Sequence, residues 1–351
     1  EVSYTMSEVL MYGVELESRC MANIVASEDT VAFLVGTQNM KATNEICHVS
    51  LDGMRLVAKS HQHIPGEVRA LASDPKDENK FATGGSDYGT LTPSHSLNIF
   101  RIINENDKLE HIVSTKMENE VKSLEWDSQG ERSAIIHNKK IEIGDVERKF
   151  ECIWSHTPQG TSSAAVWNPH SSSNVVGVTV DRSIITLDLR TKGEGHRIKE
   201  GHSLKATYID FNPNLQHSVA SCGRDGFLRL WDWRNPSSPI FSLRAHAHWT
   251  TQVHFHSVHD ELLLSSGTDG SLLLTSAYSV SSDSRASREE EGDNVVTLPD
   301  GPLERIDEHE DSIYACAWST ADPWTFASLS FDGRILISHV NREHKYALMK
   351  L

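Results

Sequence analysis

The chain has 351 residues, 38 % of them hydrophobic, and its 49 acidic and 33 basic residues give a formal net charge of −16. This surplus of acid disfavours direct binding to nucleic acid, whose usual protein footprint is a basic stripe, and disfavours electrostatic docking on anionic lipid. No apolar run approaches the roughly 18 residues that a membrane-spanning helix needs, and the first residues lack a signal-peptide pattern. The five scattered cysteines form no C-x-x-C pair, which favours reduced thiols and a soluble, cytoplasmic protein.

The first two repeats of the chain are degenerate. Short β-branched and apolar runs predict strands in the first repeat at 11–16, 31–37, 45–49 and 56–60. The same signals in the second repeat predict strands at 68–72, 81–87 and 97–102. A loop containing Gly, Ser and Pro, residues 88–96, separates the last two of these strands.

The third and fourth repeats each predict three strands. In the third repeat these are 121–126, 133–137 and 140–143, and in the fourth they are 163–167, 174–180 and 184–189.

Residues 201–234 form the clearest repeat. Gly201-His202 opens the stretch and Trp231-Asp232 closes it, and these dipeptides typically bracket one four-stranded blade of a WD40 propeller. Between them we expect strands at 206–211, 219–222 and 227–231.

The bracketing residues of this stretch also predict a buried polar chain. We expect the side chains of His202, Ser221, Asp225 and Trp231 to form one hydrogen-bonded structural tetrad, which would satisfy polar groups that are costly to bury alone. A His/Ser/Asp hydrolase triad is the alternative interpretation. We reject it because all its members lie in one repeat, at blade spacing, without a nucleophile elbow.

The last two repeats predict strands at 251–255, 262–266 and 272–276, then at 313–318, 325–329 and 334–340. A Ser-rich and acidic insertion, residues 279–301, precedes the seventh repeat and is predicted to be a flexible loop. A loop that binds a partner or is phosphorylated, with Ser284 and Ser287 as sites, is the alternative.

Two landmarks recur with the same period. The turn aspartates Asp181, Asp225, Asp269 and Asp332 are 44, 44 and 63 residues apart. The aromatic residues that end each first strand are 41, 44, 44 and 63 residues apart: Trp126, Trp167, Phe211, Phe255 and Trp318. Steps near 44 match the WD40 period, and the longer step contains the insertion.

The repeats together predict an all-β chain, a seven-bladed WD40 β-propeller that forms a single domain over residues 1–351. The expected repeats are about 10–60, 61–117, 118–160, 161–201, 202–245, 246–308 and 309–351. One further strand must complete the last blade, and segments 2–9 and 346–351 could each supply it. We favour the C-terminal segment because it directly follows that blade.

Candidate chemical sites are few. His254, His256 and His259, with His246 and His248 nearby, suggest zinc, but carboxylate or thiolate ligands at suitable spacing are missing, so we expect no metal. No glycine-rich loop precedes a Lys-Ser/Thr pair, so we expect no nucleotide or other cofactor. An enzyme would instead need clustered titratable groups in the central channel.

The end of the clearest repeat carries a second motif. Trp231-Asp232-Trp233-Arg234 resembles the WDxR box, by which some WD40 proteins dock on the cullin-4 ubiquitin-ligase adaptor. In that family the arginine makes the contact, which would correspond to Arg234 and, in a weaker copy, to Arg190. The alternative interpretation is that Arg234 only pairs with a neighbouring carboxylate.

Several stretches resemble one WD-repeat family, the EARP-and-GARP-complex-interacting proteins. EHEDSIYACAWSTADPWTFASLSFDGRILI (308–337) is similar to the last blade of this family, and YGVELESR (12–19) followed by FLVGTQ (33–38) looks like its first blade. HAHWTTQVHFHSVHDELLLSSGTDG (246–270) and DFNPNLQHSVASCGRDG (210–226) extend the resemblance, as does the terminal KYALMKL.

This resemblance implies a non-enzymatic adaptor that binds the EARP and GARP vesicle-tethering complexes. It implies roles in endosomal recycling, retrograde transport to the trans-Golgi network and dense-core vesicle cargo sorting. The protein would lie in the cytoplasm, peripheral to the trans-Golgi network and endosomes, without direct membrane insertion. We expect Trp249 and Trp324 to pack between blades, but either would be a plausible binding hot spot if exposed.

Overall fold

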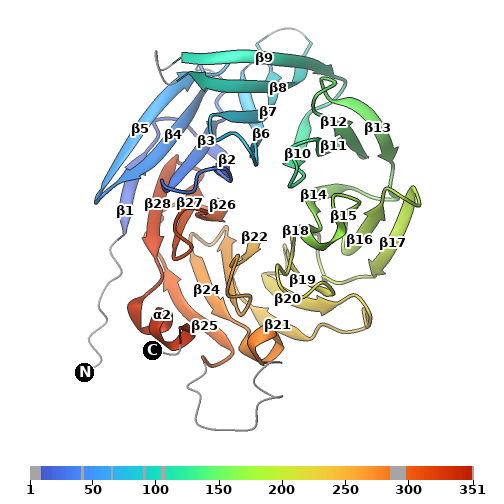
Figure 1. Cartoon of the computed structure of the whole chain (residues 1–351), viewed down its shortest axis with the longest axis vertical. Coiled ribbons are helices and arrows are strands. Elements are labelled where there is room, and N and C mark those ends of the chain that lie inside the picture. The colour runs from blue at the N-terminus through green and yellow to red at the C-terminus, as the bar shows by residue number, and fades with distance from the viewer. Residues whose placement is uncertain are drawn as a thin grey trace.

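The computed structural model describes residues 9–40, 43–64, 66–89, 92–103, 108–284 and 298–349. These residues form seven four-stranded sheets, which stand as blades in a ring around a central channel (Figure 1). All neighbouring strands within a blade pair antiparallel. The structure therefore confirms the predicted seven-bladed β-propeller.

The first three blades are each built from four consecutive strands, counted from the channel outward. Blade one contains β2 (Ser18–Asn23), β3 (Ala32–Thr37), β4 (Glu45–Asp52) and β5 (Arg55–Gln62). Blade two contains β6 (Glu67–Ser73), β7 (Lys80–Asp87), β8 (Ser94–Ile103) and β9 (Lys108–Met117). Blade three contains β10 (Val121–Trp126), β11 (Arg132–His137), β12 (Lys140–Asp145) and β13 (Glu151–His156).

Blades four to six follow the same plan. Blade four contains β14 (Ser162–Trp167), β15 (Val175–Val180), β16 (Ser183–Asp188) and β17 (Gly193–Ile198). Blade five contains β18 (Ala206–Phe211), β19 (Ser218–Gly223), β20 (Phe227–Asp232) and β21 (Phe241–Arg244). Blade six contains β22 (Thr250–Phe255), β23 (Leu262–Gly267), β24 (Leu272–Ser276) and β25 (Gly301–Ile306).

The core lies between adjacent blades. The second strands β3, β19, β23 and β27 (Thr325–Ser330) are buried along their whole length, because both faces of each sheet pack against a neighbouring blade. The aromatic residues that end the inner strands also pack in these interfaces, at 4–7 % exposure: Trp126, Trp167, Phe211, Phe255 and Trp318. Because this position is buried between blades, an aromatic residue recurs there from repeat to repeat.

The seventh blade is closed by the N-terminal strand, so the expected closure by 346–351 is wrong. Its strands are β26 (Ile313–Trp318), β27, β28 (Arg334–His339) and, on the outside, β1 (Leu10–Gly13). β1 pairs with β28 from Leu10 opposite Ile337 to Gly13 opposite Arg334. The prediction that segment 11–16 begins the first blade is therefore wrong. The expected first repeat, 10–60, contains a strand of the last blade.

The C-terminal segment forms a helix instead of a strand. In α2 (Arg342–Leu348), Asn341 is the N-cap, and its side chain accepts a hydrogen bond from the Glu343 N–H at 3.0 Å. The following residues, Arg-Glu-His-Lys-Tyr-Ala-Leu, contain several strong helix formers. Of the alternative closing segment 2–9, all but Val9 lie outside the described residues.

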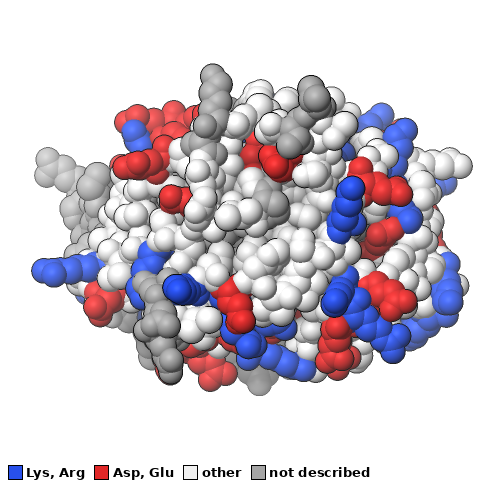
Figure 2. Space-filling model, turned by 90° about the horizontal axis from the view of Figure 1, so that it is seen from above, with Lys and Arg blue, Asp and Glu red and all other residues white. Residues whose placement is uncertain are grey.

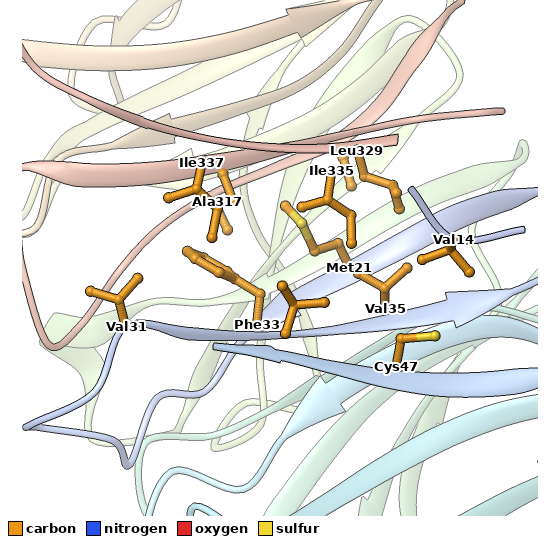
Figure 3. Close-up of a cluster of buried hydrophobic side chains, with 13 residues drawn as sticks. Val14, Met21, Val31, Phe33, Val35, Cys47, Ala317, Leu329, Ile335 and Ile337 are labelled. Atoms are coloured by element: carbon orange, nitrogen blue, oxygen red, sulfur yellow. The ribbon is translucent and has the colours of Figure 1, made fainter. Parts of the chain in front are cut away.

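A hydrophobic cluster joins the two ends of the ring. Figure 3 shows Phe33 and Val35 of blade one facing Leu329, Ile335 and Ile337 of blade seven. All five side chains are fully buried. This interface holds blade one, near the start of the chain, against blade seven, near its end.

The insertion in blade six is described only at its ends. Residues 285–297, including Ser287, lie outside the described residues. Ser284 is 6 % exposed and its hydroxyl donates to the Ser279 carbonyl at 3.1 Å, so that hydroxyl is not a free modification site. After the insertion, the outer strand β25 begins at Gly301 and ends at Ile306.

The outer surface carries both signs of charge. Seen from the edge of the ring, acidic and basic side chains are interspersed among uncharged ones (Figure 2). Within the described part of the chain, no helix has the length and apolar character required to cross a membrane.

Candidate functional site

The four tetrad side chains of blade five form one hydrogen-bonded chain. The Trp231 indole N–H donates to Ser221 Oγ at 2.9 Å, and His202 Nε2 lies 2.8 Å from the same oxygen. At the other end His202 Nδ1 lies 3.0 Å from the Asp225 carboxylate. In the tautomer that completes the chain, the Ser221 hydroxyl donates to Nε2 and Nδ1–H donates to Asp225.

Arg229 places a positive charge beside the carboxylate at the end of this chain. Its guanidinium lies 2.9 Å from Asp225, and the Ser203 backbone N–H also donates to that carboxylate, at 3.0 Å. Burial alone would raise the pKa of Asp225, but the hydrogen bonds from His202 and Arg229 hold it well below its usual range. Burial lowers the pKa of His202. A neutral imidazole therefore faces an ionised carboxylate, which ties the loop before β18 to β20.

Blades six and seven keep shortened versions of this chain. His246 Nε2 lies 3.1 Å from Ser265 and its Nδ1 lies 3.1 Å from Asp269. In blade seven His309 Nε2 lies 2.7 Å from Ser328, but Nδ1 contacts Ser330, which in turn donates to Asp332. Thr275 and Ser338 occupy the positions equivalent to Trp231, so these blades lack the indole.

Arg234 lies outside the tetrad and forms a local ion pair. Its guanidinium contacts the Asp232 carboxylate at 2.6 Å, and 57 % of the arginine side chain is exposed. Arg190 forms the same pair with Asp188 at 2.7 Å. The arrangement matches the pairing interpretation, and in both cases exposed guanidinium surface remains.

The two candidate tryptophans have different environments. Trp249 is 38 % exposed at the mouth of the channel, where the Arg224 guanidinium stacks 4.3 Å from its ring, so the expectation that it packs between blades is wrong. Trp324 is half-buried. It packs against the cluster between blades six and seven and is covered by Lys345 of α2, whose Nζ lies 5.0 Å from its ring.

The histidine cluster is divided between two environments. His254 lines the channel, whereas His256 follows the end of β22 and is fully buried. His256 Nδ1 accepts the backbone N–H groups of Val258 and His259, and Nε2 lies 2.8 Å from the Pro323 carbonyl. The two imidazoles therefore do not share one face of the strand. Across the described residues, no three His, Cys, Asp or Glu side chains are grouped to hold a metal ion.

The channel mouth is shaped by a repeated backbone irregularity. Each inner strand contains a β-bulge in its first half, where pairing with the second strand skips one residue, or two in blade four. A bulge re-aims the extra side chain. The bulge residues are Arg19, Arg69, Lys122, Ser163, Thr207, Thr251 and Tyr314, and all seven line a central cavity of about 820 Å³.

A second level of side chains lies three residues further along each inner strand, roughly 10 Å away. Here Glu125, Asp210 and His254 face the same cavity. Burial raises the pKa of Glu125 to about 8, with the Asp210 charge adding to the shift. Burial also raises the pKa of Asp210 to about 7, and lowers that of His254 to about 4. Sequence reasoning missed this group, although each member directly precedes an aromatic landmark residue.

These channel groups contact backbone of the neighbouring blades. The Asp210 carboxylate accepts the Phe255 N–H at 2.8 Å, which links blades five and six. Thr207 and Thr251 hydroxyls donate to the next inner strand, at the carbonyls of Thr250 and Ile313. The carboxyl groups of Glu125 and Asp210 can take up and release protons. The Thr207 hydroxyl is already engaged, so it does not form a nucleophile–base pair with His254.

Comparisons with known proteins agree with this architecture. Residues 6–275 match the family model described as EIPR1 beta-propeller, and residues 301–337 match a WD domain, G-beta repeat. The chain is 42 % identical to EARP-interacting protein 1 of Caenorhabditis elegans, over 99 % of the chain and 100 % of that protein. It is 29 % identical to EARP and GARP complex-interacting protein 1 of Homo sapiens, over 97 % and 98 % of the two chains. It is also 30 % identical to WD repeat-containing protein DWA2 of Arabidopsis thaliana, over 94 % and 95 %. None of these three names describes an enzyme.

Proposed function

Because the chain belongs to the EIPR1 β-propeller family, we propose that it is a non-enzymatic adaptor that binds the EARP and GARP vesicle-tethering complexes. The observation that carries this proposal is the near full-length match to a relative named as an EARP-interacting protein. The proposal includes endosomal recycling, retrograde transport to the trans-Golgi network and sorting of dense-core vesicle cargo. The protein would reach the trans-Golgi network and endosomes through its partners.

Physical features of the ring support an adaptor. Every described blade packs against two others, and polar side chains cross-link adjacent inner strands, so the ring presents a fixed surface. The side chains of the His202–Asp225 chain hydrogen-bond to one another within blade five, which supports a structural role for that chain. A preorganised surface lowers the entropic cost of binding.

We propose Trp249 as a contact residue, since exposed aromatic side chains beside arginine are frequent interface hot spots. Trp324 is a weaker candidate because α2 covers part of its ring. In a binding assay Trp249→Ala should weaken capture of tether subunits without lowering the melting temperature. Trp324→Ala should lower the melting temperature, because it opens the cluster between blades six and seven.

The test of the proposal is affinity capture of the tagged chain from cytosolic extract, followed by mass spectrometry. Recovery of EARP and GARP subunits is the expected result. Recovery of the cullin-4 adaptor without tether subunits would instead support the ubiquitin-ligase alternative and overturn the proposal.

Arg234→Ala separates these functions further, and Arg305→Ala is a matched control, because Arg305 also pairs with an aspartate two residues away, Asp307, at 2.8 Å. Loss of the cullin-4 adaptor alone in the Arg234 variant would assign the WDxR box to that adaptor. Loss of tether subunits in that variant would place Arg234 in the tether contact.

A further inference from the structure

The channel mouth carries positive charge in a protein whose net charge is −16. Three consecutive blades present a basic side chain at the bulge position: Arg19, Arg69 and Lys122. Arg69 is neutralised, because it pairs with Glu67 at 2.6 Å and approaches Glu120 at 3.6 Å. Arg19 and Lys122 are exposed and have no carboxylate partner within 4 Å among the described residues.

Arg224 adds a third unpaired cation. It lies in the β19–β20 hairpin, is exposed and lines the same cavity, again without a carboxylate partner in the described part of the chain. The neighbouring Lys205 is half-buried, and its pKa is lowered by burial and by the charges of Arg224 and Lys122. A lowered lysine pKa is the expected consequence of unbalanced positive charge. We call Arg19, Lys122 and Arg224 the basic mouth.

The guanidinium groups of the two arginines in the basic mouth stack on aromatic rings. The Arg19 guanidinium lies 4.7 Å from the Tyr314 ring centre and 4.8 Å from that of Phe331. The Arg224 guanidinium lies 4.3 Å from the Trp249 ring centre. Stacking of this kind leaves the N–H edges of the guanidinium free, and those edges match a carboxylate bidentately.

We propose that the basic mouth binds an acidic linear segment of a partner protein, with its carboxylates on Arg19, Lys122 and Arg224 and an apolar side chain against Trp249. A segment fits better than a folded surface because the cavity is concave and holds only about 820 Å³. This inference deepens the proposed function, on which it rests for the identity of the partner as a tether subunit.

A nucleic acid is the less suitable occupant. Its closely spaced phosphates would meet only three unpaired cations and, deeper in the channel, the carboxyl groups of Glu125 and Asp210. The net charge of −16 also repels a long polyanion. A short acidic segment carries fewer charges and keeps its carboxylates at the mouth, so both penalties are smaller for it.

The test uses a fluorescein-labelled peptide of alternating Glu and Gly residues around one Phe, with binding to the full chain followed by fluorescence anisotropy. The same peptide with Gln in place of Glu is the ligand control. A triple variant, Arg19→Gln, Lys122→Gln and Arg224→Gln, should weaken binding at least about tenfold. A matched triple variant of exposed cations on outer strands and their turns, Arg55→Gln, Lys108→Gln and Arg148→Gln, should bind like the wild type.

A further variant separates the effect of charge from that of guanidinium geometry, and a stability measurement checks the fold. Arg19→Lys with Arg224→Lys retains the charge but loses the planar fork, and should bind with intermediate affinity. Thermal unfolding of each variant verifies that the fold is kept. The inference is overturned if the Gln-containing peptide binds equally well, if both triple variants bind like the wild type, or if a single-stranded RNA oligonucleotide outcompetes the acidic peptide.

Capture from cytosol separates this inference from the proposed function. If the wild type captures tether subunits and the basic-mouth variant captures them equally, the inference fails and the proposed function stands. If the wild type binds the acidic peptide through the basic mouth but captures no tether subunits, the proposed function fails and the peptide site stands. Loss of both activities in the basic-mouth variant alone supports the two together.

Discussion

Gly333 lies where the ring closes, and its replacement by alanine should open that closure. The residue has φ of +85°, a left-handed conformation that costs an L-residue about 1–2 kcal/mol. An added Cβ would lie against the carbonyl oxygen of Val14 and 2.6 Å from that of Leu16, on the segment that leads from β1 into the first blade. The Val14 N–H also donates to the Gly333 carbonyl at 2.8 Å.

The magnitude follows from two separate terms. Gly270 occupies the equivalent turn of blade six with φ of +78°, but there the added Cβ would meet its nearest atoms at 3.4 and 3.6 Å, which is ordinary contact. Gly270→Ala should therefore cost only the backbone strain, about 1–2 kcal/mol. Gly333→Ala adds overpacking, about 1–3 kcal/mol, and weakens a hydrogen bond, about 1 kcal/mol. We expect it to be about 2–4 kcal/mol worse than Gly270→Ala.

Urea unfolding followed by tryptophan fluorescence measures this difference, since the chain contains 8 tryptophans. Gly13→Ala is the third variant of the series. It lies in β1 with no atom within 4 Å of the added Cβ, and its backbone is not left-handed, so stability should be unchanged or slightly higher. Equal destabilisation by Gly333→Ala and Gly270→Ala would refute the argument that the closing segment restricts this turn.

Three other variants or reagents test the interior. Trp231→Phe should lower the free energy of unfolding by about 1–2 kcal/mol more than Trp233→Phe: both rings are 4 % exposed, but only the Trp231 N–H has a partner among the described residues. Equal losses would mean that the indole hydrogen bond contributes nothing. The pKa of His256 is lowered by burial to about 4 from an ordinary 6.5, so unfolding takes up a proton below pH 6.5 and stability falls with pH in that range. His256→Asn should therefore lose about 1–2 kcal/mol less stability than the wild type between pH 7 and pH 5, and an unchanged pH slope would contradict this. A maleimide should label the exposed Cys152 in the native protein and the buried Cys222 only in denaturant, and rapid native labelling of Cys222 would indicate an open blade interface.

The inner three strands of most blades could be predicted because burial constrains their sequence. The fully buried β19 reads as a continuous run of small and apolar residues, and the aromatic landmarks mark where inner strands end. The outer strands were mostly missed. β13 and β21 have no fully buried residue, so their side chains carry little hydrophobic signal.

Ring closure was mispredicted because pairing between distant segments leaves no local signature. β1 has only four residues and pairs with a strand more than 300 residues away. Nothing in its composition distinguishes an outer strand of the last blade from a first strand of the first. The C-terminal helix did carry a readable signal, since Asn341 is a favoured N-cap before a run of helix formers.

Two of the three residues of the basic mouth, Arg19 and Lys122, occupy the same column of the repeat alignment. Lys122 lies four residues before the landmark Trp126, and Tyr314 lies four before Trp318. The same column in the first two repeats contains Arg19 and Arg69. The bulges that turn this column into the channel have no sequence signal, so the residues in this column could not be assigned to the channel from the sequence. Arg224 has no such regularity, and only the structure places it beside Trp249.

The pairing of β1 with β28 also has a consequence for biosynthesis. A ribosome adds about 5–20 residues per second, so the partner of Leu10–Gly13 leaves it tens of seconds after that segment. During this interval the other blades can assemble, while β1 has an unsatisfied backbone edge that other chains or chaperones can engage. The pairing that closes the ring can therefore form only after β28 has been synthesised.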